Sequence, residues 1–218
     1  MNDYLKVVYN KGVRPYTNYP SKLCRYLFKR FNLNKGDHLL DLGCGRGEFL
    51  KEFSALGLNS EGMDCCKSAV ELSKGHKIEV CDFENQRLPY PDNYFGVIFC
   101  KSVIEHSYCP EKIFKEAYRI LKPNGKFIVM TPDWESVYRT FYEDYTHRMP
   151  FTLNSLKNIY AIFGFGKIRV CKFRQLPILW KFPVLNVFSK IIALVFPRSK
   201  IKAIRFSKEV MLLGIAEK

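Results

Sequence analysis

Three carboxylates lie at the ends of predicted strands, and the first of them stands two residues before a glycine-rich turn. Asp41 precedes Gly43-Cys44-Gly45-Arg46-Gly47, while Asp64 and Asp82 end the next two predicted strands. Glycines at this spacing let a ligand approach the backbone closely. Glu48 stands where a dinucleotide-binding fingerprint has its third glycine, and no Gly-Lys-Ser/Thr of a P-loop follows. An acid at the strand end before such a turn suits a ligand with an ammonium group rather than a pyrophosphate.

The two later acids predict what else the ligand carries. Asp64 is placed to accept hydrogen bonds from both hydroxyls of a ribose. Asp82 is placed to accept from an adenine amino group, with Phe83 near the ring. An adenosine that carries a charged amino acid is S-adenosylmethionine, which is therefore the predicted cofactor. For the glycine segment alone, the alternative is a tight strand-to-helix turn without a ligand, and each acid alone could be a turn former.

Short apolar strands alternate with helices through the first two-thirds of the chain. Strands are predicted at 38–42, 58–63, 77–81, 94–100 and 126–131, and helices at 21–31, 48–56, 67–74 and 111–121. A helix capped by Thr152 and two strands, at 168–173 and 209–216, follow. This alternation predicts an α/β fold with a parallel sheet, helices on both faces, and ligands outside the carboxyl ends of the strands.

Residues 37–132 resemble a class I S-adenosylmethionine-dependent methyltransferase of the broad group that includes quinone, sterol and sugar methyltransferases. The motifs are Leu88-Pro89-Tyr90-Pro91-Asp92-Asn93-Tyr94-Phe95-Gly96-Val97-Ile98, Val103-Ile104-Glu105-His106 and Arg119-Ile120-Leu121-Lys122-Pro123-Asn124-Gly125. The resemblance implies a Rossmann-like, mostly parallel seven-stranded sheet with an antiparallel last strand. Gly96 departs from the pattern, because an acid usually follows the phenylalanine, and we expect this to affect local strand packing rather than activity.

The resemblance also assigns cofactor-binding residues. Gly43, Cys44, Gly45 and Gly47 would wrap the methionine portion, Asp64 with Cys65 beside it would hold the ribose, and Asp82 with Phe83 would frame the adenine. Lys101 and Ser102 would line the sulfonium end, largely through backbone. Tyr16 and Tyr19 either close over the cofactor or pack on the surface.

Two histidines are candidates for the base that an oxygen acceptor needs, because an imidazole titrates near neutral pH. His147 is the first choice, with Asp144 one helical turn earlier to orient it, and His106 is the second. The stretch around His147 resembles one in methyltransferases associated with polysaccharide synthesis. The alternative is that Asp144 and His147 only brace the loop, and that His106 is a loop residue bonded to backbone.

The formal net charge of +14 is concentrated in one region. Residues 145–208 contain thirteen Lys and Arg and no Asp or Glu. We predict a single domain, 1–218, with an N-terminal cap (1–36), a cofactor-binding core (37–173), a basic amphipathic insert (174–208) and a last strand (209–218). The insert would contact an anionic membrane, cradle a phosphorylated acceptor, or form a lid on the domain.

The eight cysteines form no C-x-x-C pair, so we expect no metal site, and reduced thiols. The first residues lack the apolar stretch of a signal peptide, so a cytoplasmic protein is expected, with peripheral membrane contact through the insert as an option. The predicted acceptor is a sugar, glycan or related small molecule. A quinone-like lipid at the membrane surface and a non-catalytic, cofactor-binding protein are the alternatives. Nucleic acid is not favoured, because the aromatics of the insert do not alternate with bases.

Overall fold

The computed structural model describes residues 5, 7, 12, 14–73, 75–182, 184–185 and 210–218. Most of the predicted basic insert, namely 183 and 186–208, lies outside these residues. Among the described residues, no helix has both the length and the hydrophobicity that crossing a membrane requires.

A seven-stranded sheet forms the centre of the molecule. Its strands are β1 (His38–Leu42), β2 (Asn59–Asp64), β3 (Ile78–Val80), β4 (Phe95–Lys101), β5 (Leu121–Pro132), β6 (Gly166–Arg174) and β7 (Val210–Glu217). They are arranged in the order β3-β2-β1-β4-β5-β7-β6. β1 to β5 pair in parallel, and β7 runs antiparallel to both β5 and β6. The predicted fold class, with its antiparallel last strand, is confirmed.

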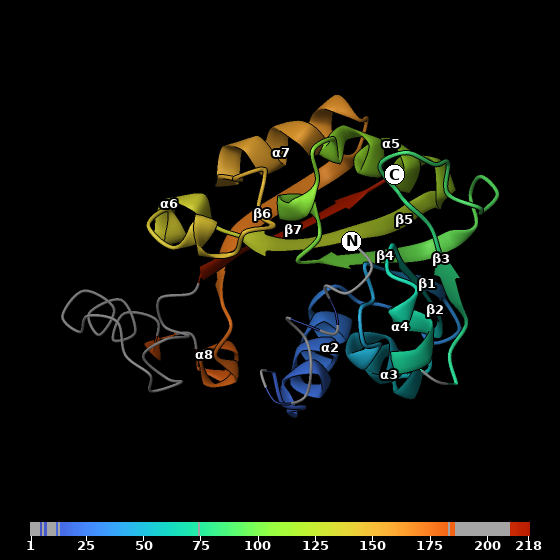
Figure 1. Ribbon diagram of the computed structural model, residues 1–218, viewed down its shortest axis with the longest axis horizontal. Helices are drawn as coiled ribbons and strands as arrows, with labels where there is room; N and C mark the ends of the chain where they lie inside the picture. The colour runs from blue at the N-terminus through green and yellow to red at the C-terminus, as the bar shows by residue number, and fades with distance from the viewer. Residues whose placement is uncertain are drawn as a thin grey trace.

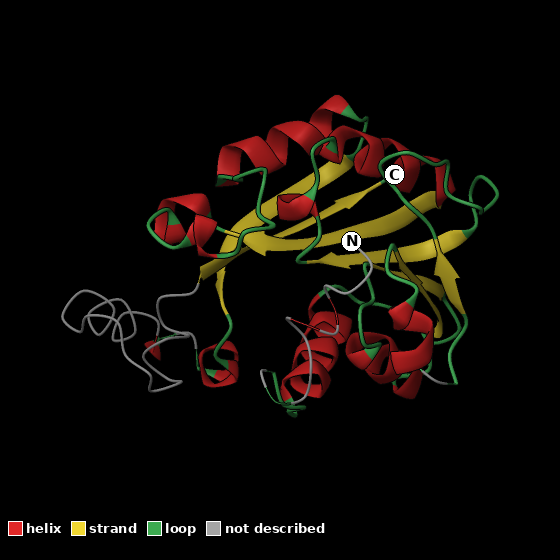
Figure 2. Ribbon diagram, viewed as in Figure 1, coloured by secondary structure: helices red, strands yellow, loops and turns green. Residues whose placement is uncertain are grey.

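Helices cover the sheet on both faces (Figures 1 and 2). One face carries α2 (Tyr19–Arg30), α3 (Glu48–Ala55) and α4 (Ser68–Leu72), and the other carries α5 (Pro110–Ile120) and α7 (Leu153–Ile162). Short elements follow strand ends: η1 (Ile104–His106) comes after β4, α6 (Trp134–Val137) and η2 (Phe141–Glu143) come after β5, and α8 (Pro177–Lys181) comes after β6. The loops that follow β4 and β5 carry the candidate histidines.

The core is divided by the sheet, because successive side chains of a strand point to opposite faces. In β4, Ile98 joins the cluster that contains Phe114 and Tyr160, whereas Phe99 joins the cluster that contains Leu27. This double burial explains why β4 is apolar along its whole length, as is usual for an inner parallel strand.

Several element boundaries differ from the predicted ones. α2 begins two residues earlier than expected because Pro20 fits the first turn of a helix, where its missing N–H costs no hydrogen bond. α4 is shorter than predicted. The register of β4 against β5 shifts between Phe95 and Val97, at Gly96, so the departure from the family motif coincides with a local irregularity of the sheet.

Candidate functional site

The glycine turn after β1 is held against the end of β2 by backbone hydrogen bonds. The amides of Gly43 and Cys44 both donate to the carbonyl of Met63, at 2.7 and 2.9 Å. Gly43 has a φ of +78°, and a Cβ there would lie 2.2 Å from a methyl carbon of Val103. Gly43 therefore meets two requirements that only glycine satisfies, a left-handed conformation and close packing against the loop after β4.

Asp41 lies beneath this turn and is 2% exposed. Burial, together with the nearby charge of Asp64, raises the pKa of Asp41 to about 7, against the opposing effects of the Leu50 amide and Lys101. Its Oδ2 atom is buried and has no hydrogen-bond partner among the described residues. A buried carboxylate oxygen without a donor among these residues fits a ligand that brings an ammonium group, and the role of Asp41 in binding such a ligand stays a prediction.

Asp64, at the end of β2, accepts two backbone hydrogen bonds. Its Oδ2 accepts from the amide of Gly45 at 2.8 Å, and its Oδ1 accepts from the amide of Cys66 at 2.9 Å. Burial raises the pKa of Asp64, while these two amides act in the opposite direction. Each carboxylate oxygen has a second lone pair, so the side chain keeps acceptor capacity for a ribose. Cys65, next along the chain, is exposed.

Asp82 follows β3 and builds a turn. Its oxygens accept from the amides of Glu84 and Asn85 and from the Asn85 side chain. The hydrogen bond from the Asn85 side chain is the main reason that the pKa of Asp82 is lowered. Phe83 is half-buried against the core. The turn-forming role of Asp82 is thus visible directly, and its contact with adenine remains a prediction.

Arg46, in the glycine turn, contacts Arg14 and Tyr16 of the N-terminal segment. Its guanidinium donates to the carbonyl of Arg14 at 2.7 Å, lies 4.4 Å from the ring centre of Tyr16, and forms an ion pair with Glu48. Tyr19 instead donates to Gln175 at 2.9 Å. Of the two tyrosines predicted to close over the cofactor, Tyr16 is the one held at the turn.

Lys101 is the last residue of β4, and Ser102 follows it. Ser102 has a φ of +57°, its amide donates to Met130 at 2.8 Å, and its Oγ accepts from Lys101 at 3.3 Å. The charge of Lys101 favours the ionised forms of both Asp41 and Glu105. The charge of Lys101 therefore stabilises two buried carboxylates, those of Asp41 and Glu105.

The structure brings the two candidate histidines together, although they are 41 positions apart in the sequence. The ring centres of His106 and His147 lie 4.8 Å apart. The Thr146 hydroxyl donates to Asp144 at 2.6 Å and lies 2.9 Å from Nδ1 of His106. Because that hydroxyl gives its proton to the carboxylate, it accepts from the His106 ring, so a neutral His106 carries its proton on Nδ1. Asp144 thus reaches His106 through Thr146, a link that the sequence did not predict.

His147 is oriented by the backbone. Its Nδ1 lies 2.6 Å from the carbonyl oxygen of Phe141, and a carbonyl can only accept, so this nitrogen carries the proton. The sequence predicted that Asp144 orients the ring of His147. In the structure the carbonyl of Phe141 orients this ring, while Asp144 accepts a hydrogen bond from Thr146. Burial and the neighbouring His147 lower the pKa of His106 to about 4, so His106 is uncharged at neutral pH.

Glu105 is a candidate that sequence reasoning missed. It is 1% exposed, and its Oε2 accepts from the hydroxyl of Thr131 at 3.0 Å. Burial raises its pKa to about 7. The signal in the sequence was the acid directly before His106, in the segment that follows the predicted strand 94–100.

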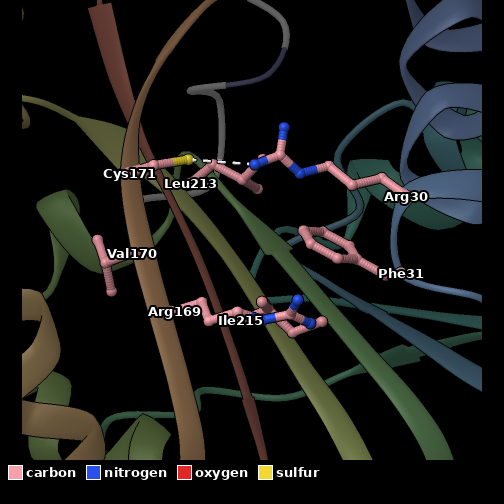
Figure 3. A pocket seen from close by; sticks show the side chains of 7 residues that line it. All are labelled: Arg30, Phe31, Arg169, Val170, Cys171, Leu213 and Ile215. Atoms are coloured by element: carbon pink, nitrogen blue, oxygen red, sulfur yellow. Dashed lines mark hydrogen bonds between the residues drawn. The ribbon is translucent and has the colours of Figure 1, made fainter.

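A separate hollow lies away from these strand ends. It occupies about 80 Å³ between the end of α2 and the middle of β6 and β7, and its lining includes Arg30, Phe31 and Arg169 (Figure 3). The Arg30 guanidinium donates to the sulfur of Cys171 at 3.6 Å. None of the predicted cofactor-binding or catalytic residues lines this hollow.

Comparison with known proteins agrees with the geometry. Residues 40–129 match the family model described as "Methyltransferase domain". An uncharacterised protein of Methanocaldococcus jannaschii is 30% identical over 112 residues, which are 51% of this chain and 53% of the relative. The ubiquinone biosynthesis O-methyltransferase of Coxiella burnetii is 28% identical over 120 residues, 49% of this chain and 48% of the relative. The chain thus spans about half the length of these curated relatives.

A solved structure extends the similarity of the fold to the whole chain. A S-adenosylmethionine-dependent methyltransferase from Archaeoglobus fulgidus superposes with a TM-score of 0.70 at 21% identity, covering 98% of this chain and 99% of the other. The predicted family resemblance is confirmed. Residues 40–129 are a methyltransferase domain, within a chain that has the fold of the class I S-adenosylmethionine-dependent methyltransferases.

Proposed function

We propose that this chain transfers a methyl group from S-adenosylmethionine to a hydroxyl of a sugar, glycan or related small molecule. The observation that carries the cofactor assignment is Asp41, whose buried Oδ2, beneath a glycine turn, has no donor among the residues that the structure describes. An ammonium group at this place would supply the missing donor.

The residues around Asp41 would hold the rest of the cofactor. The turn from Gly43 to Gly47 would lie against the methionine portion, Asp64 would accept from the ribose, and Asp82 with Phe83 would border the adenine. Tyr16 is held at the turn by Arg46 and would help to exclude water from it. The bound cofactor supplies a methyl group on a positively charged sulfur, which is already activated for displacement.

The acceptor would approach from the loops that carry His106 and His147. As its hydroxyl oxygen bonds to the methyl carbon, the carbon–sulfur bond breaks with its electron pair going to sulfur, and the hydroxyl proton passes to a histidine. Both histidines hold their own proton on Nδ1, so Nε2 is the nitrogen that would receive it. Asp144 would stabilise the resulting charge, because it already favours the charged form of His106.

Aromatic side chains near the histidines support a ring-shaped polar acceptor. Tyr138, Tyr142 and Tyr145 are 50%, 60% and 85% exposed, and Trp134 packs against Tyr142 with ring centres 6.0 Å apart. The His147 ring lies next to Phe141 in the same loop. Tyrosines offer both an apolar ring and a hydroxyl, which suits a sugar or another hydroxylated ring.

Calorimetric titration with S-adenosylmethionine tests the cofactor assignment. We expect binding in the wild-type protein and weaker binding in Asp64→Ala and Asp82→Ala, by about 1–3 kcal/mol each, because partners of the cofactor would be left unpaired. Undiminished affinity in both variants would remove the assignment. Release of S-adenosylhomocysteine with a panel of sugar and quinol acceptors would then identify the acceptor class, and binding without turnover on any acceptor would favour the non-catalytic alternative.

A quinone-like lipid acceptor is the second candidate, and it is favoured by the basic region and by the similarity to a ubiquinone biosynthesis O-methyltransferase. It predicts salt-sensitive binding to anionic vesicles, since each base near such a surface contributes about 1 kcal/mol. The test changes five bases of the insert to Gln, namely Lys181, Lys190, Arg198, Lys200 and Lys202. The matched control changes five bases outside it, namely Lys35, Lys51, Lys67, Lys115 and Lys122. If the unmodified protein ignores anionic vesicles at low salt, the soluble sugar acceptor is retained.

A further inference from the structure

We propose that Glu105, His106 and His147 form a binding site for a divalent transition-metal ion, with Zn²⁺ as the ion to test first. One carboxylate oxygen and one ring nitrogen from each histidine lie within 4.8 Å of one another. Two histidines and one carboxylate are a donor set that holds Zn²⁺ with one position left open. The same set serves other transition metals such as Fe²⁺.

The hydrogen bonds of the two imidazoles are those of metal-binding histidines. A ligating histidine usually donates its other ring N–H to a carbonyl or a carboxylate-linked group, which fixes the tautomer. Here Nδ1 of His147 faces the carbonyl of Phe141, and Nδ1 of His106 faces a Thr146 hydroxyl that is itself bonded to Asp144. Each ring would therefore bind an ion through Nε2.

Glu105 is held in place at both its side chain and its backbone. Its carboxylate accepts from Thr131, and its carbonyl oxygen accepts from the amides of Arg148 and Met149, at 2.7 and 3.1 Å. These two amides directly follow His147, so they fix the loop of His147 onto η1. The site is consequently assembled by backbone contacts that do not need the ion.

The burial of Glu105 gives a physical reason for an ion. A carboxylate removed from water is costly unless it is paired or binds a metal. The ion pairs found among the described residues do not include Glu105. A divalent ion at this place would balance the buried charge.

A second group of potential ligands, Asp64 with Cys65 and Cys66, is less suited to an ion. Both oxygens of Asp64 already accept backbone amides, one from Gly45 in the glycine turn and one from Cys66. This group also belongs to the proposed cofactor site, where an ion would compete with the ribose.

The consequence for catalysis rests on the proposed function. An acceptor hydroxyl that occupied the open position of the ion would lose its proton at a lower pH and release it to water. In the ion-loaded protein the histidines would then be ligands, and activation of the acceptor would pass from them to the ion. Binding of the ion itself does not depend on methyl transfer.

The direct test is metal binding by the full chain, without an affinity tag and after dialysis against a chelator. We expect calorimetry with Zn²⁺ to give about one ion per chain, and Co²⁺ to give visible absorption bands. His106→Ala, His147→Ala and Glu105→Gln should each weaken binding by about 100-fold or more, and Thr146→Val, which removes an outer partner, by about 10-fold. His76→Ala, which removes a histidine outside the cluster, should leave binding unchanged.

Two results would overturn the inference: no stoichiometric Zn²⁺ or Co²⁺ binding, or equal affinity in wild type, His106→Ala and His147→Ala. S-adenosylmethionine binding, measured on the same samples, separates this inference from the proposed function. Cofactor binding without ion binding rejects the metal site alone, and ion binding without cofactor binding rejects the proposed function alone. Circular dichroism of each variant shows whether a loss of binding reflects a loss of fold, in which case Thr146→Val and Glu105→Gln decide.

Discussion

Replacing Asp41 by Asn should make the ligand-free protein more stable while weakening its hold on the cofactor. Burial raises the pKa of Asp41 from its ordinary value of 3.8 to about 7, so the folded state disfavours the charged form. Asn has nearly the same shape, and its oxygen can still accept from the Leu50 amide that contacts Asp41. The substitution therefore removes the charge with little change in packing.

The magnitude follows from the two pKa values. Because the folded protein holds the proton of Asp41 more tightly than the unfolded chain does, this group lowers the free energy of unfolding as the pH rises from about 4 to about 7. At about 1.4 kcal/mol per pH unit, the penalty reaches about 4 kcal/mol near pH 8 and about 2 kcal/mol near pH 5. Asp41→Asn should recover an amount of this order at each pH.

Urea unfolding of the wild type and the variant at these two pH values, without cofactor, measures the effect. Glu79→Gln is the matched control, because it makes the same chemical change on β3 at a side chain that is only half-buried. A stability gain of equal size at both pH values, or a loss near pH 8, would refute the reasoning. The same ionisation predicts that the wild type binds S-adenosylmethionine about tenfold more weakly near pH 6 than near pH 8, whereas Asp41→Asn binds weakly at both.

Three further substitutions test other parts of the site. Asp64→Ala should lower both cofactor affinity and the free energy of unfolding, by about 1–3 kcal/mol each, because two backbone amides lose their acceptor; calorimetry and urea unfolding measure the two effects separately. His147→Ala should keep cofactor affinity while kcat on the true acceptor falls by about 10²–10⁴, and near-normal turnover would reduce His147 to a loop brace. Gly43→Ala should lower the free energy of unfolding by about 1–3 kcal/mol, because its Cβ would lie 2.2 Å from Val103. Adding Val103→Ala in the same chain should restore part of this loss. Urea unfolding that shows no such recovery would argue against this contact.

The sequence by itself predicted the order of the elements and the class of the sheet. The continuous apolar run of β4 and the apolar residues of α5 at a spacing of about 3.6 are local patterns, and they are readable without tertiary structure. The start of α7 was equally clear, since Thr152 caps it through a reciprocal hydrogen-bond pair with Ser155. The bounds of α4 were less predictable, because the side chain of its N-cap residue, Lys67, makes no capping hydrogen bond.

Charge states and contacts between distant loops were decided only by the tertiary structure. Asp41 and Asp64 were predicted as neighbours because parallel strands end at the same edge of a sheet, but the missing partner of Asp41 is visible only in the folded chain. The pairing of His106 with His147, and the link from Asp144 through Thr146, depend on how the loop after β5 folds back over η1. The pattern of residues along the chain does not predict such a contact. The geometry of the contact depends on backbone hydrogen bonds to Glu105, and these join segments more than 40 residues apart.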